Sequence, residues 1–90
     1  MADSGPPPYR YRQDVLEELL RLGVKPTPRT RPELVHEFIR DLYRIEIRRL
    51  RERLLKREFP RREYADRVIA LRRKYPLTSL RPWDWLELRG

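Results

Sequence analysis

The fold of this 90-residue chain depends on residues 30–57, which read TRPELVHEFIRDLYRIEIRRLRERLLKR. Thr30 and Glu33 are spaced so that each side chain can accept a hydrogen bond from the other's backbone N–H at the start of a helix. Pro32 is tolerated in a first turn, because its missing N–H would have no partner there. No Gly or Pro follows until Pro60. We therefore expect one helix of roughly 40 Å, at about 1.5 Å per residue, with Thr30 as its N-cap.

The apolar residues of this stretch do not form a single stripe. At about 100° per residue, four early ones share one face, and four later ones lie well around the cylinder from them. An amphipathic helix with one neighbour presents one stripe, so we expect two neighbours, one on each half of the helix. The early face consists of Leu34, Phe38, Leu42 and Ile45, and the later face of Tyr43, Ile47, Leu50 and Leu54.

Two shorter helices are expected to be these neighbours. Residues 12–22 carry acidic side chains in their first half, where the helix dipole favours them, and Gly23 supplies a left-handed stop. Residues 61–75 repeat apolar positions at intervals of four, three and four residues. The short break at Phe59-Pro60 predicts an antiparallel helical hairpin between the long helix and this third helix.

The hairpin has a recurrent layout: a leucine-bearing helix (Leu50, Leu54), a brief turn (Phe59-Pro60) and a second helix that opens with Glu63-Tyr64. This order resembles the short C-terminal helical hairpins of the SHOCT type. Glu58 stands near the position of the usual turn glycine, and Pro60 replaces the usual threonine cap. The resemblance covers the hairpin alone, and it implies no particular function.

One helical domain is expected over residues 12–76, preceded by an extended arm at residues 1–11. Consecutive prolines favour a polyproline conformation in this arm, and Tyr9 and Tyr11 alternate with arginines. The arm is either a disordered leader or a segment that orders on a partner, with the two tyrosines as anchors.

Residues 77–90 form a short C-terminal segment that is strongly apolar for a chain end. Its two tryptophans have two interpretations: they fold back to cap the core of the hairpin, or they anchor another protein. We expect them to divide these roles. Trp85, Leu86 and Leu88 would close the core, while Trp83 would face outward with the arm.

Composition excludes several classes of function. The chain has no Cys, so it holds no disulfide and no thiolate metal site. It has no run of about 18 apolar residues, so no membrane span is expected. The start of the sequence lacks the apolar core of a signal peptide, and a cytoplasmic location is therefore expected. An arginine-rich, proline-rich and cysteine-free composition suits a thermophile, and a GC-rich genome gives the same bias.

Few residues of this sequence could bind a metal ion or take part in catalysis. Glu33 and His36 have the Glu-x-x-His spacing of carboxylate-bridged metal bundles, but such sites need a second motif and further carboxylates. Only a homodimer would supply that second copy, so we expect His36 to be a surface histidine, and we expect no metal and no cofactor. The chain has no glycine-rich phosphate loop, and its hydroxyl side chains fall in predicted loops or caps. We expect no enzymatic activity.

The chain is strongly basic, with a formal net charge of +8. Four arginines, which we call the arginine row, lie within about a quarter turn of one another on the long helix. Such a row is typical of surfaces that track phosphates. The alternative is a solvated face with internal ion pairs between Glu37 and Arg40, Asp41 and Arg44, Glu46 and Arg49, and Glu52 and Lys56. The arginine row consists of Arg40, Arg44, Arg48 and Arg51.

The sequence therefore predicts an all-α, three-helix protein with helices near 12–22, 31–57 and 61–75. Its first predicted function is that of a non-enzymatic accessory protein. It would dock on a larger protein assembly through Tyr9, Tyr11 and Trp83. The second hypothesis is an RNA- or DNA-binding accessory protein that uses the arginine row. Self-association into a homo-oligomer is compatible with either hypothesis.

Overall fold

The computed structural model describes residues 7–87, which form three α-helices and three short 3-10 helices. Within these residues the only β-pairing is an isolated antiparallel bridge between Tyr11 and Leu86, so the predicted all-α class is confirmed. Each α-helix begins and ends within three residues of its predicted bounds. The elements are α1 (Gln13–Arg21), α2 (Pro32–Leu55), η1 (Arg61–Glu63), α3 (Tyr64–Lys74), η2 (Pro76–Ser79) and η3 (Pro82–Trp85).

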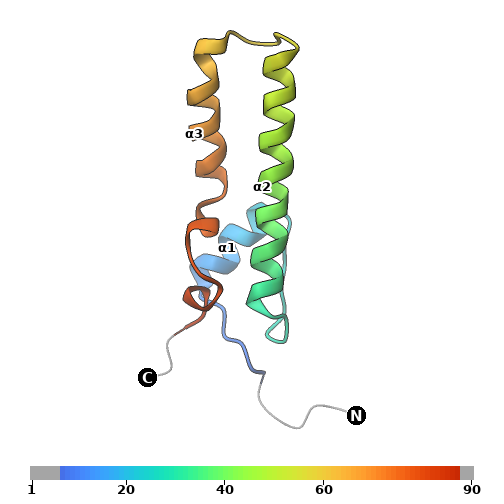
Figure 1. The fold of residues 1–90 in the computed structure, drawn as a ribbon. Helices are drawn as coiled ribbons and strands as arrows, with labels where there is room; N and C mark the ends of the chain where they lie inside the picture. The colour runs from blue at the N-terminus through green and yellow to red at the C-terminus, as the bar shows by residue number, and fades with distance from the viewer. Residues whose placement is uncertain (1–6, 88–90) are drawn as a thin grey trace.

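The molecule is elongated, with principal extents of 57 × 29 × 17 Å. Figure 1 shows α2 and α3 side by side as an antiparallel hairpin, with α1 crossing the lower half of α2 and the C-terminal segment below α3. We call residues 44–74, the upper part of the hairpin, the prong. The remaining described residues, 7–43 and 75–87, form the base.

The core of the molecule lies in the base. It combines the arm, α1, the first half of α2 and the C-terminal segment, and Trp85, Leu19 and Ile39 are fully enclosed in it. The C-terminal segment therefore does not cap the core of the hairpin, as one of the two interpretations held. It fills the centre of the base instead. The core cluster consists of Tyr11, Val15, Leu19, Val35, Ile39, Leu77 and Trp85.

The predicted early face of α2 is wrong. Phe38 is 52% exposed and Leu34 is 56% exposed, whereas Val35 and Ile39 are buried. The buried residues of α2 (Pro32, Val35, Ile39 and Leu50) fall within about 60° of one another at 100° per residue. Val35 and Ile39 share the core cluster with residues of α1, and Leu50 is buried in the half of α2 that runs beside α3 (Figure 1). Both neighbours therefore pack against a single side of the long helix.

The predicted N-cap is also wrong. The N-cap position is Arg31, which makes no side-chain capping bond, and α2 begins at Pro32. The Thr30 hydroxyl accepts a hydrogen bond of 2.9 Å from the Thr27 N–H, within the connector between α1 and α2, residues 22–31. The connector thus competes for the side chain that the cap would need.

Candidate nucleic-acid interface

The whole net charge of the chain lies on the prong. Residues 44–74 contain 13 basic and 5 acidic residues, a net charge of +8, whereas the rest of the chain contains 9 of each. The prong also has little interior, because Leu50 and Phe59 are its only buried residues and α3 has none. Most of its side chains therefore project into solvent, and the prong presents a dense field of positive charge.

The arginine row follows the solvent side of α2. All four of its members are exposed. Of the four ion pairs expected from spacing, the structure forms one, in which the Arg44 Nη1 lies 3.4 Å from the Asp41 Oδ1. Within residues 7–87 the other three members of the row, Arg40, Arg48 and Arg51, have no acidic partner.

Glu46 turns away from the surface of α2 and contacts α3 instead of Arg49. Its Oε1 lies 3.2 Å from the Lys74 Nζ, and its Oε2 accepts a short hydrogen bond from the Tyr75 hydroxyl. Burial and this carboxylate raise the pKa of Tyr75 to about 12. Glu46 thus joins the two helices where the prong meets the base, and it neutralises no member of the arginine row.

The tip of the prong has a backbone feature that sequence reasoning missed. Arg57 has φ +60°, in the left-handed region that glycine usually occupies after a helix end. The Arg57 N–H donates to the Leu54 carbonyl, and the Glu58 N–H donates to the Arg53 carbonyl, both at 3.0 Å. These two bonds form a Schellman motif, which closes α2 without a glycine. No Gly lies near residue 57, so no local residue pattern indicates this turn type.

The arm is part of the base from Tyr9 onward, rather than a free tail. The Tyr9 N–H donates to the Pro28 carbonyl at 3.0 Å, and the Arg12 N–H donates to the Trp85 carbonyl at 2.8 Å. Tyr11 is only 7% exposed, and its hydroxyl donates to the Thr30 carbonyl at 2.5 Å. Burial raises the pKa of Tyr11 to about 12. Tyr11 is therefore a core residue, and its predicted exposure as an anchor is wrong.

The two tryptophans differ in burial, as expected. Trp85 is fully buried, with its Nε1–H pointing to the Leu77 carbonyl at 3.4 Å, whereas Trp83 is 58% exposed. Leu86 packs against the core, and Leu88 lies outside the described residues. Contact between Trp83 and a partner stays a prediction, and Tyr9 is half-buried against the core.

His36 is not the surface histidine that we expected. Its Nε2 lies 2.7 Å from the Leu80 carbonyl oxygen, and its ring packs at 5.3 Å between centroids against Trp85. Trp85 therefore covers one side of the His36 ring, and the histidine is half-buried. Among residues 7–87 no group of three or more His, Asp or Glu side chains is placed to hold a metal ion.

Comparison with protein-family models, with curated proteins and with solved structures found no match. The likeness of the hairpin to SHOCT-type hairpins therefore has no further support. No helix of the described chain, residues 7–87, is both long enough and apolar enough to cross a membrane.

Proposed function

We propose that this protein is a non-enzymatic accessory protein that binds nucleic acid through the prong. One observation carries the proposal: the net charge of +8 lies entirely on residues 44–74, a segment that contributes almost nothing to the core. A thin helical hairpin gains no stability from collecting this much like charge. A polyanion that contacts the prong would offset the repulsion.

The form of the positive charge also supports a phosphate ligand. Most of the basic residues are arginines, whose planar guanidinium donates two parallel hydrogen bonds to a phosphate. The members of the arginine row that lack an acidic partner keep these donors available. Each contact with a phosphate would release condensed counterions, so binding would weaken steeply as salt rises.

The experiment replaces Arg40, Arg44, Arg48 and Arg51 together by Gln. We expect this variant to bind RNA more weakly, with the slope of log K against log salt reduced by about 0.7 for each lost contact on single strands. Fluorescence anisotropy over a salt series measures the slope. Arg40 is the one member of the row that lies in the base, one turn before the prong begins. The matched control removes the same charge from positions of the base outside the arginine row, with Arg10, Arg21, Lys25 and Arg31 replaced by Gln.

The control variant should retain the wild-type slope. Equal loss in both variants would mean that binding follows total charge and not the prong. An unchanged slope in the first variant would mean that the arginine row touches no phosphate.

Docking on a larger protein assembly is the second candidate function. The observation that favours it is the exposure of large apolar side chains on the base, at Leu34, Phe38 and Trp83. Trp83 thus remains a candidate anchor, and Leu34 and Phe38 take the place of the buried Tyr11. If this function holds, nuclease treatment should leave a defined protein bound to the wild type, and Trp83→Ala should weaken its capture without changing the melting temperature.

A further inference from the structure

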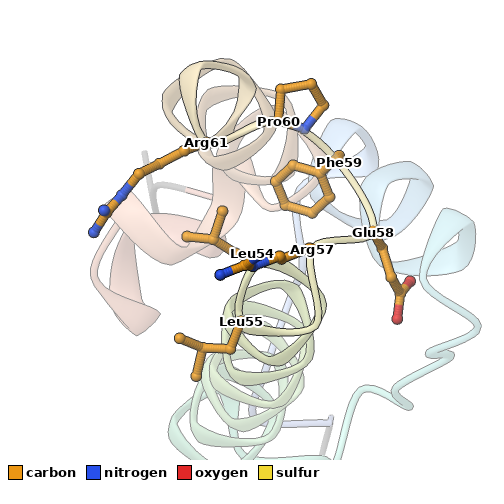
Figure 2. A pocket seen from close by; sticks show the side chains of 7 residues that line it. All are labelled: Leu54, Leu55, Arg57, Glu58, Phe59, Pro60 and Arg61. Atoms are coloured by element: carbon orange, nitrogen blue, oxygen red, sulfur yellow. The ribbon is translucent and has the colours of Figure 1, made fainter.

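An open hollow lies at the tip of the prong, where α2 turns into η1. It has a volume of about 730 Å³, and Leu54, Leu55 and Pro60 contribute apolar surface to it. Figure 2 shows the side chains of Arg57 and Arg61 extending to the same side of the turn, with Leu54 between them and Leu55 below. The hollow therefore combines an apolar surface with two guanidinium groups on one side.

Arg57 occupies a strained position at this hollow. Its φ of +60° is one that a residue with a Cβ adopts at a cost, and glycine would close the same turn more favourably. Strain of this kind is found where a side chain serves a function that the alternative residue lacks. At this position the side chain that glycine would lack is the guanidinium beside the hollow.

The charges around the hollow are unbalanced. Residues 53–62 contain five basic residues and one acidic residue. That acidic residue, Glu58, lies 3.1 Å from the Arg53 Nε, so it does not neutralise Arg57 or Arg61. Within residues 7–87 neither of these two arginines has an acidic partner. Both keep their donors free for an anion.

The apolar side of the hollow is open to a ligand. Leu55 is 76% exposed, although its neighbour Leu54 is half-buried. Behind them Phe59 is buried, with the Arg67 guanidinium carbon 4.1 Å from the centre of its ring, which holds the turn in place. Apolar side chains and arginine planes at such a site suit an unpaired base, because unpaired bases expose faces that a duplex hides.

We propose that the tip hollow seats one unpaired nucleotide of a looped or single-stranded RNA. Its base lies on Leu54 and Leu55, and its flanking phosphates contact Arg57 and Arg61. This inference rests on the proposed function and adds to it a preference for unpaired over paired RNA. The arginine row would track the adjoining backbone.

The test compares binding to an RNA hairpin with an unpaired loop and to a fully paired RNA of equal length. The wild type should bind the loop more tightly. Arg57→Gly should lose roughly tenfold in affinity for the loop and about 0.7 in salt slope, while its melting temperature stays level or rises because the strain is relieved. Leu55→Ala should reduce loop affinity about fivefold with an unchanged salt slope.

Lys56→Gln is the matched control, since it removes one charge from the tip without lining the hollow or changing the strain. It should keep the wild-type preference for the loop. If Lys56→Gln and Arg57→Gly lose the same affinity, the tip acts only as diffuse charge and the inference is overturned. If Leu55→Ala binds the loop as the wild type does, no base is seated there.

Two further outcomes separate this inference from the proposed function. Binding of neither RNA by the wild type would overturn both. Equal binding of the two RNAs would leave the proposed function standing and overturn the inference. Vesicles of anionic phospholipid are the last probe: loss of vesicle binding, but not of loop binding, in Leu55→Ala would mean that the tip enters a lipid surface instead.

Discussion

The base and the prong differ in their net charge and in how much apolar surface they bury, although α2 runs through both. The base carries no net charge and encloses all seven residues of the core cluster, whereas the prong carries +8 and buries two residues. The base is therefore stabilised by apolar burial, and the prong by the helix that it shares with the base and by a few contacts of its own. This division allows the exposed end to collect charge that a packed core would not tolerate.

Replacing Trp85 by Ala should give the largest loss of stability. Trp85 is fully buried in the base, and removing a side chain of this size costs about 3–5 kcal/mol out of a total of about 5–15. Thermal unfolding followed by circular dichroism measures the loss. Trp83→Ala is the control, which should change stability by no more than about 0.5 kcal/mol. Equal losses would mean that the core does not centre on Trp85.

Leu50→Asp tests whether the prong can open while the base stays folded. Leu50 is 8% exposed, so an unpaired carboxylate at this position should destabilise the folded prong by about 2–4 kcal/mol. Amide exchange should become faster in α3 and in the second half of α2, while the emission of Trp85 stays that of a tryptophan shielded from water. Val68 is only half-buried, so Val68→Asp should have a smaller effect than Leu50→Asp. If amide exchange also rises in the base and the Trp85 fluorescence shifts to that of a tryptophan in water, the base and the prong unfold as a single cooperative unit.

Alkaline pH should weaken the base and its junction with the prong. Burial raises the pKa of Tyr11 and of Tyr75 to about 12, from an ordinary value of 10.0. The folded state thus holds its phenolic protons where the unfolded state releases them. The contribution of these two tyrosines to the free energy of unfolding should be fully present below pH 10 and should fall from pH 10 to 12. Denaturant titrations across this range measure the fall. Tyr11→Phe should make it shallower, and an unchanged pH dependence in that variant would contradict the burial of Tyr11.

The smallest effects on stability are expected for substitutions at two adjacent residues of α2. Ile39→Val removes one buried methyl group and should cost about 0.5–1.5 kcal/mol. Phe38→Ser removes far more apolar surface, but Phe38 is 52% exposed, so its effect should stay within about 0.5 kcal/mol. Urea midpoints of the two variants test the direction. A larger loss for Phe38→Ser would restore the face that the sequence predicted.

The sequence by itself determined the helices and the site of the positive charge. Pro32, Gly23, Pro60 and Pro76 act within a few residues of where they stand, so they set the bounds of α1, α2 and α3 in any tertiary arrangement. The charge of residues 44–74 is likewise a property of composition. The arginine row could be listed from helical spacing alone, because its members project from one continuous helix.

Tertiary structure decided which side of α2 is buried and which polar groups bond to distant segments. His36 bonds to Leu80, 44 residues away, and Tyr11 bonds to Thr30, 19 residues away. Periodicity reports only that a helix has apolar positions, and α2 has more of them than its neighbours can cover. The choice of Val35 and Ile39 over Leu34 and Phe38 depends on where Trp85 and α1 pack against the helix. That choice is settled by contacts between distant segments, which no local pattern contains.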